Sequence, residues 1–208
     1  VLGQMTGASL RATVAVTPVS SNTGAESKFD TVIRTRIGSP YVIAGMQSIA
    51  GDVVGYEANG GFLLGFAAMG PVGILSPLMT RDAVLPLVAP LAHARAAGGV
   101  AALVAGEPAR FTAADRLQEV PTEKSKDLVA NLDTNKRKMA DFLATFAAIE
   151  AGVDRTDGLR VTLKDGRIVH LRPSGNAPEL RFYVEADSTE AAEATLAKGL
   201  AALRVALT

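Results

Sequence analysis

The chain reads His-Leu-Arg-Pro-Ser-Gly-Asn-Ala-Pro-Glu-Leu-Arg-Phe-Tyr-Val-Glu-Ala-Asp from His170 to Asp187. Apolar residues alternate with polar ones in its second half, and a cluster of Pro, Ser, Gly and Asn precedes them. Such alternation is typical of a strand, and such clusters are typical of turns. The stretch therefore predicts the end of one strand, a tight loop and a second strand.

The loop concentrates the groups that bind a phosphate monoester. Arg172, Ser174 and Asn176 alternate through it, and Arg181 lies just inside the following strand. Guanidinium groups make charge-assisted, bidentate hydrogen bonds to phosphate, and backbone N–H groups at a turn through Gly175 would form an anion-binding concavity. From spacing alone, a solvated hairpin loop with two surface arginines is the simpler interpretation.

The composition is that of an ordinary globular protein. Of 208 residues, 48% are hydrophobic and 20% are charged, which predicts one large or two ordinary domains. Lys+Arg and Asp+Glu are balanced at 21 each, so no overall charge attracts nucleic acid or an anionic membrane. With no cysteine, two histidines and no clustered acids, we expect neither disulfides nor a metal site.

No apolar run approaches the roughly 18 residues expected of a membrane span. The first residues also lack the basic-then-apolar pattern of a secretory signal. We therefore expect a cytoplasmic protein with no membrane partner.

Strands and helices alternate in the first half of the chain. This order predicts an α/β layered domain over residues 1–107 with a mixed, largely parallel sheet. A long helix is expected over Thr80–Ala97, with Thr80 as its N-cap and Asp82 in its first turn. The expected strands are Ala12–Thr17, Thr31–Thr35, Asp52–Tyr56 and Phe62–Leu64.

The second half, residues 108–208, has a different pattern. Asp165-Gly166 separates two alternating runs, which is a strong signal for a β-hairpin, and a leucine-rich helix follows Asp187. We expect an α+β domain with an antiparallel sheet and helices on one side. The expected elements are helices at Thr122–Leu132 and Asn135–Ile149 and strands at Leu159–Lys164, Arg167–Arg172 and Leu180–Ala186.

A second polar stretch, Gly55–Gly61, lies between two apolar strands. Its glycines let the backbone turn sharply and present Glu57 and Asn59. A carboxylate accepts from two neighbouring hydroxyls, and an amide both donates and accepts, so this pair suits the vicinal diol of a sugar. The alternative is a Gly-rich hairpin with two solvated side chains.

A third stretch, Thr35–Tyr41, contains Arg36 at the end of an expected strand. A guanidinium hardly ever loses its proton in proteins, so Arg36 would bind a phosphate or hydroxyl and would not act as a base. Arg34 and Arg36 as ordinary surface charges are the alternative.

The segment from Arg172 to Arg181 resembles the phosphate-binding loop in the last domain of the α-D-phosphohexomutases, the family of the bacterial phosphomannomutases and phosphoglucomutases. The resemblance implies that Arg172, Ser174, Gly175, Asn176 and Arg181 grip the phosphate at the non-reacting end of the sugar. The family more often has Thr at the position of Asn176.

The other two stretches resemble the same family. Glu57 and Asn59 stand in a segment like its sugar-recognition loop, where some members have a His at the position of Gly61. Arg36 stands where the family has a Lys that is its candidate acid/base. The resemblance therefore implies substrate binding by Arg36, Glu57 and Asn59, and no catalytic residue in this chain.

This likeness covers Val1 to about Leu203 and matches the third and fourth of the family's four domains. Residues 1–107 would form the sugar-recognition domain and 108–208 the phosphate-binding domain. The family's phosphoserine and its triplet of Mg²⁺-binding aspartates belong to the first two domains, and no Asp-x-Asp-x-Asp occurs here.

The resemblance implies the C-terminal half of an isomerase that interconverts hexose 1- and 6-phosphates through a hexose 1,6-bisphosphate. The N-terminal domains would be its partner, Mg²⁺ would be needed only by the whole enzyme, and the chain alone would be inactive. The alternative functions are a non-catalytic phosphosugar- or anion-binding module, or a structural partner of a separate N-terminal half.

Overall fold

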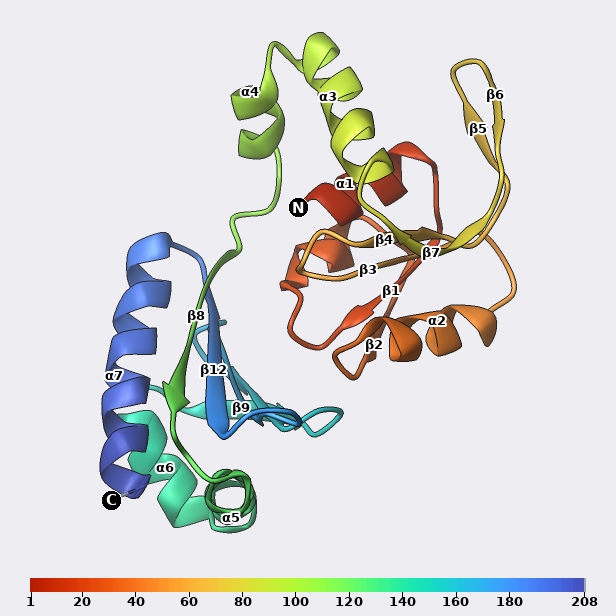
Figure 1. Cartoon of the computed structure of the whole chain (residues 1–208). Helices are drawn as coiled ribbons and strands as arrows, with labels where there is room; N and C mark the ends of the chain where they lie inside the picture. The colour runs from red at the N-terminus through yellow and green to blue at the C-terminus, as the bar shows by residue number, and fades with distance from the viewer. Residues whose placement is uncertain (208) are drawn as a thin grey trace. The chain divides into compact units, whose positions relative to one another are not determined.

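The computed structural model describes residues 1–207, which form two compact units, residues 1–109 and 110–207. The first unit is built on a five-stranded sheet with the strand order β2-β1-β3-β4-β7 (Figure 1). Its strands are β1 (Val14–Pro18), β2 (Thr31–Thr35), β3 (Val53–Tyr56), β4 (Phe62–Leu64) and β7 (Leu78–Asp82).

This sheet is mixed, as expected, but the expectation of a largely parallel sheet is wrong. Strand β1 pairs in parallel with β2 and β3, whereas the β3–β4 and β4–β7 pairs are antiparallel. The physical reason lies in the connections. A parallel pair needs a long crossover, and the short Gly-rich turn between β3 and β4 permits only an antiparallel hairpin.

Helices cover both faces of the first sheet (Figure 1). On one face, α2 packs Val42 and Met46 against Val16 and Leu63. On the other, α1 comes so close to β3 that a Cβ at Gly3 would lie 2.5 Å from the ring of Tyr56. The helices of this unit are α1 (Leu2–Ser9), the 3-10 helix η1 (Thr23–Ser27), α2 (Ser39–Gln47), α3 (Leu85–Ala97) and α4 (Val100–Ala105).

The prediction that a helix starts at Thr80 is wrong. Thr80 to Asp82 continue strand β7, where Asp82 pairs with Phe62 of β4, and α3 begins at Leu85. Asp82 lies just before the helix, and its carboxylate accepts from the backbone N–H of Val84, the N-cap residue, at 2.7 Å. A further hairpin, β5 (Ala68–Gly70) with β6 (Gly73–Leu75), was not expected from the sequence.

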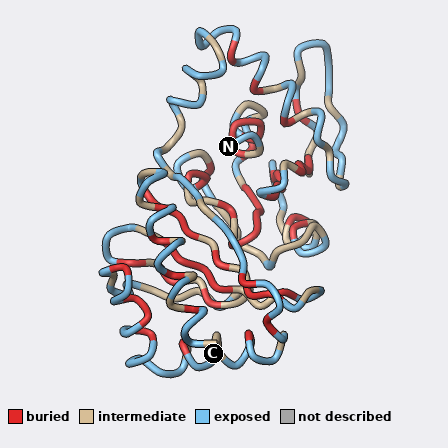
Figure 2. The backbone as a smooth tube through the Cα atoms, turned by 60° about the vertical axis from the view of Figure 1, so that its left-hand side comes forward, coloured by how far each residue is buried: buried red, intermediate tan, exposed pale blue. Residues whose placement is uncertain are grey.

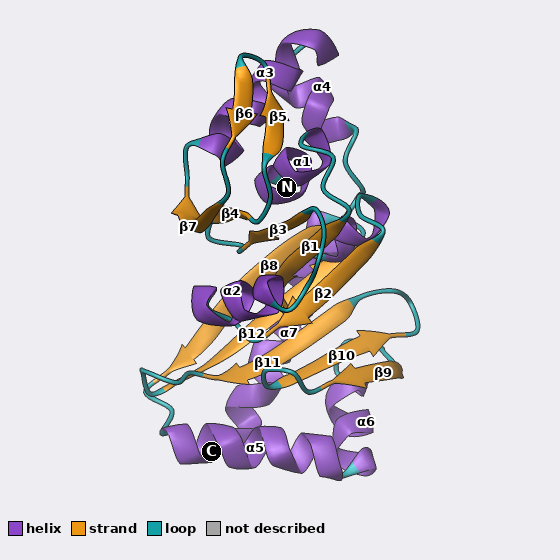
Figure 3. Ribbon diagram, turned by 90° about the vertical axis from the view of Figure 1, so that its right-hand side faces the viewer, coloured by secondary structure: helices purple, strands orange, loops and turns teal. Residues whose placement is uncertain are grey.

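The second unit has a five-stranded antiparallel sheet with the order β8-β12-β11-β10-β9, which confirms the antiparallel sheet predicted for this half. Figure 3 shows α5 and α6 along one side of this sheet. Its elements are β8 (Phe111–Gln118), α5 (Thr122–Thr134), α6 (Lys136–Ala144), β9 (Glu150–Asp154), β10 (Leu159–Leu163), β11 (Ile168–Pro173), β12 (Glu179–Ala186) and α7 (Thr189–Leu207).

Alternating strand residues and the three helices share one core (Figure 2). Leu171, Leu180 and Phe182 are fully buried in it, together with Leu143 of α6 and Leu203 of α7. Side chains alternate between the two faces of a strand, so the residues between these apolar ones lie on the opposite face.

The predicted hairpin at Asp165-Gly166 is confirmed, with Gly166 at φ 85° between β10 and β11. The helix expected to reach Ile149 instead ends at Ala144, and the next residues from Glu150 form the edge strand β9. No helix among residues 1–207 is long and apolar enough to cross a membrane.

Close packing of α7 on β12 gives a stability prediction. A Cβ at Gly199 would lie 2.3 Å from the ring of Phe182. We expect Gly199→Ala to destabilise the protein by about 1–3 kcal/mol through overpacking, although alanine favours a helix. Urea unfolding measures this. Gly152→Ala is the control, because nothing lies within 4 Å of its added Cβ, and equal stability of the two variants would contradict the packing argument.

Candidate phosphate and sugar site

The antiparallel register brings Arg172 and Arg181 together. Arg172 of β11 is the direct cross-strand partner of Arg181 of β12. Directly opposed residues have Cβ atoms about 4.5–5.5 Å apart and share a face of the sheet. Because the neighbouring Leu171 and Phe182 are buried in the helix-covered core, the two guanidinium groups lie on the open face.

Each arginine has a carboxylate partner. Arg172 Nε donates to Asp157 at 2.8 Å, and Arg181 donates to Glu179 from Nε at 2.8 Å and pairs with it through Nη2 at 2.7 Å. The Glu179 carboxylate raises the pKa of Arg181. These carboxylates offset the repulsion between two opposed cations, so the guanidinium groups are held close together before any ligand binds.

The loop between the two strands is open. The Ser174 hydroxyl, which is buried, donates to the side-chain oxygen of Asn176 at 3.0 Å, and the backbone N–H of Ser174 donates to the carbonyl of Glu179. Gly175 has no positive φ and nothing within 4 Å of a Cβ. Within residues 1–207 its backbone N–H has no acceptor, which leaves a donor at the loop tip for an anion.

His170 lies beside the arginine pair. Its side chain is buried, Nε2 donates to the backbone carbonyl of Asp157 at 2.6 Å, and its ring stacks on Tyr183 at 5.3 Å. The same Asp157 holds Arg172 through its carboxylate. Burial lowers the pKa of His170, so a neutral imidazole fixes the segment that orients Arg172.

In the first unit, the turn after β3 brings Glu57 and Asn59 together. The Ser39 hydroxyl, at the start of α2, donates to one oxygen of Glu57, and the Asn59 amide donates to the other at 3.4 Å. Asn59 in turn accepts from the backbone N–H of Gly61 at 3.0 Å, in a turn where Gly60 has φ 90°. Glu57 is 8% exposed, and its hydrogen-bond partners Ser39 and Asn59 are polar, which suits a carboxylate that binds sugar hydroxyls.

Two arginines at the end of β2, Arg34 and Arg36, differ in their surroundings. Arg34 donates to the backbone carbonyls of Ser21 at 2.7 Å and Asn22 at 2.9 Å, so it is a structural residue and not a loose surface charge. Arg36 is exposed, and its guanidinium lies 5.9 Å from the centroid of the Tyr41 ring. Arg36 is therefore exposed to solvent, whereas Arg34 is held by backbone carbonyls.

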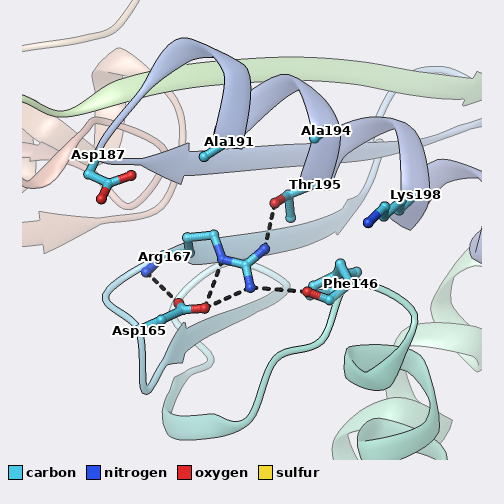
Figure 4. Close-up of a pocket in the computed structure, with 8 residues that line it drawn as sticks. All are labelled: Phe146, Asp165, Arg167, Asp187, Ala191, Ala194, Thr195 and Lys198. Carbon is cyan, nitrogen blue, oxygen red and sulfur yellow. Dashed lines mark hydrogen bonds and ion pairs between the residues drawn. The ribbon is translucent and has the colours of Figure 1, made fainter.

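A separate cavity of about 270 Å³ lies between the β10–β11 hairpin and α7 (Figure 4). Arg167 is the arginine that lines this cavity. Its guanidinium donates to Thr195 at 2.7 Å, to the carbonyl of Phe146 at 3.1 Å and to Asp165 at 2.6 Å. With its donors so engaged, Arg167 ties the hairpin to the helix and does not form a second anion site.

The acidic and histidine side chains of the described residues are scattered or paired with arginines. Among residues 1–207, no three His, Asp or Glu side chains gather in a way that could hold a metal ion. The acidic side chains at the arginine pair are instead engaged by guanidinium groups.

The sequence did not point to several of the residues in these clusters. The sequence did not indicate a role for His170, Asp157 or Glu179. Each of them contacts a residue from another strand or turn, and such contacts are not visible in the sequence. Ser39 was missed because α2 brings it to Glu57 from eighteen positions away.

These features define a two-unit protein with a pair of opposed arginines on the face of an antiparallel sheet that its helices leave uncovered. Residues 114–203 match the family described as "Phosphoglucomutase/phosphomannomutase, C-terminal domain". The chain belongs to the phosphoglucomutase/phosphomannomutase family.

Two phosphomannomutases are similar to nearly the whole chain. That of Sinorhizobium fredii is 43% identical over 208 residues, covering 97% of this chain and 44% of its own length. That of Salmonella muenchen is 41% identical, with 91% of this chain and 41% of its own length covered. The chain thus spans less than half the length of the curated relatives it matches.

Solved structures share the fold. A phosphoglucomutase/phosphomannomutase family protein from Burkholderia thailandensis matches with a TM-score of 0.67 and 17% identity, covering 99% of this chain and 41% of its own. An N-acetylphosphoglucosamine mutase from Aspergillus fumigatus, solved with GlcNAc-6P and magnesium, matches with a TM-score of 0.64 and 14% identity, covering 97% of this chain and 46% of its own.

The buried His170 predicts a pH dependence of stability. Because its folded pKa is lowered, the unfolded chain takes up a proton at a higher pH, near 6.5. Stability is therefore full above about pH 6.5 and falls as the pH drops through the lower folded value. Urea unfolding at pH 7.5 and 5.5 should show a smaller loss for His170→Gln than for the wild type.

The matched control for this measurement is His93→Gln. His93 is the other of the two histidines and is exposed on α3. We expect this control to keep the pH dependence of the wild type. Equal pH dependence in both variants would contradict the role assigned to His170.

Proposed function

We propose that this chain is the C-terminal, substrate-binding half of a phosphomannomutase or phosphoglucomutase that interconverts hexose 1-phosphates and 6-phosphates. The observation that carries the proposal is the cross-strand pair of Arg172 and Arg181 on an open sheet face. Its support outside the geometry is the 43% identity to a phosphomannomutase along almost the entire chain.

We assign residues 108–208 to phosphate binding. Arg172 and Arg181 provide two guanidinium groups, which bind a phosphate dianion through charge-assisted hydrogen bonds. Ser174, Gly175 and Asn176 line the loop between them and contribute a hydroxyl, a backbone N–H and an amide. The loop thereby offers both charge and directional donors to one phosphate.

We assign residues 1–107 to sugar recognition. The Glu57 carboxylate is oriented by Ser39 and Asn59, and a carboxylate retains further acceptor capacity for ligand hydroxyls when two donors already contact it. Asn59 contributes an amide beside it. Arg36, a permanent cation, binds phosphate or hydroxyl groups and does not transfer protons.

This division of tasks fits a reaction in which a bisphosphate intermediate binds in two orientations. A phosphate clamp and a hydroxyl reader each bind a feature that both orientations present. The phosphoserine that donates the phosphoryl group, and the Mg²⁺ that neutralises its charge, would belong to the N-terminal part that the longer relatives have. The place of action would be the cytoplasm.

The first test of the proposal is ligand binding. Titration of glucose 1,6-bisphosphate by calorimetry should show weak, salt-sensitive binding to the wild type. Charged hydrogen bonds contribute about 1.5–3 kcal/mol each, so Arg172→Ala should weaken binding roughly 10- to 100-fold.

Arg155→Ala is the matched control. It removes the same charge from an exposed arginine of the same unit that pairs with Asp133, and we expect binding like that of the wild type. Absence of wild-type binding, or equal losses in both variants, would count against the phosphate clamp and favour a purely structural role.

The second test concerns turnover. We expect the purified 208-residue chain to convert no glucose 1-phosphate to glucose 6-phosphate with Mg²⁺ and glucose 1,6-bisphosphate present, because its residues supply no phosphoryl donor. A full-length phosphomannomutase serves as the positive control in the same coupled assay. Turnover by protein of verified mass would overturn the assignment of this chain to substrate binding alone.

A further inference from the structure

A third arginine lies in line with the pair. Strand β12 lies between β11 and β8, and Arg181 is the register partner of Arg172 on one side and of Arg116 on the other. Neighbouring strands lie about 4.8 Å apart. The three residues therefore form one row across the open face, which we call the arginine row.

One buried carboxylate links two members of this row. Glu179 is 7% exposed and pairs through one oxygen with Arg181 at 2.7 Å and through the other with Arg116 Nε at 3.2 Å. Like charges opposed across strands repel, so Glu179 is the group that lets Arg116 and Arg181 stay side by side.

The arginine row carries a net positive charge. Its three guanidinium groups face two carboxylates, those of Glu179 and Asp157, which leaves one excess positive charge. The Arg116 side chain is 51% exposed. Its closest contact with Glu179 is made by Nε. A guanidinium presents five N–H donors, so most of those of Arg116 remain open to a ligand.

We propose that Arg116 is a third phosphate-binding residue and that the arginine row holds one phosphomonoester dianion. The inference rests on the proposed phosphate site at Arg172 and Arg181. Glu179 contacts Nε of Arg116, and the exposed remainder of this guanidinium binds phosphate oxygens. The carboxylate thus positions the row and is not displaced by the ligand.

The test is calorimetric titration of glucose 6-phosphate and of inorganic phosphate. Compared with the wild type, Arg116→Ala should bind roughly tenfold more weakly, because one charge-assisted contact is lost. The dependence of affinity on NaCl should also become less steep. Arg155→Ala, which makes the same change of charge at another exposed arginine, should leave both quantities as in the wild type.

A second variant separates binding from positioning. Arg116→Gln removes the cation but keeps an amide donor for Glu179, so Glu179 and Arg181 stay ordered. We expect the same roughly tenfold loss as for alanine. Wild-type affinity in Arg116→Gln, with a loss only in alanine, would overturn direct binding and leave Arg116 as a positioning residue.

The outcomes for the two proposals differ. Loss of binding in Arg172→Ala combined with wild-type affinity in Arg116→Ala would overturn the arginine row and leave the two-arginine site intact. A wild type that binds neither ligand would overturn both proposals. Circular dichroism verifies that each variant is folded. We expect the Arg116 variants to fold, because Arg116 is exposed on an edge strand.

Discussion

The pairing of β11 with β12 is the constraint from which the geometry of the second unit follows. This register sets Arg172 opposite Arg181 and, one position away, Leu171 opposite Phe182. A slip of one residue would move every side chain of a strand to the other face. The burial of Leu171 and Phe182 under α6 and α7 therefore fixes the positions of the arginines as well. The same strand register therefore determines both the packing of the core and the positions of the two arginines.

The elements that could be predicted from the sequence are those with strong local patterns. The Asp165-Gly166 hairpin combines a turn that favours positive φ with strict alternation in β10, whose residues are alternately buried and partly exposed. Strand β8 was missed because most of its residues are exposed, so it shows no alternation. The start of α3 was misplaced because Thr80 and Asp82 suit a helix N-terminus, while pairing with β4 keeps them extended.

The same distinction applies to the candidate site. Glu57 and Asn59 are two positions apart in one turn, and the loop from Arg172 to Arg181 is continuous, so residue type and spacing indicate both. Asp157, Glu179 and Arg116 matter through their cross-strand and turn contacts. Those contacts depend on register and strand order. The sequence indicates register and strand order only through the hydrophobic pattern of the strands, and that pattern is weak in the edge strands.

The two candidate clusters differ in how firmly their side chains are held. Arg172 and Arg181 lie on adjacent inner strands of a five-stranded sheet and are braced by Asp157, Glu179 and the stacked His170. Functional groups on strands are positioned more accurately than groups on loops. Glu57 and Asn59 lie on a glycine turn, held mainly by hydrogen bonds to Ser39 and Gly61. Under the proposed function, a bisphosphate that binds in two orientations places its strictest demand on the phosphate, since phosphate geometry is the same each time while the hydroxyls presented differ. A rigid sheet would then suit the proposed phosphate clamp, and an adaptable turn would suit the proposed sugar-binding residues.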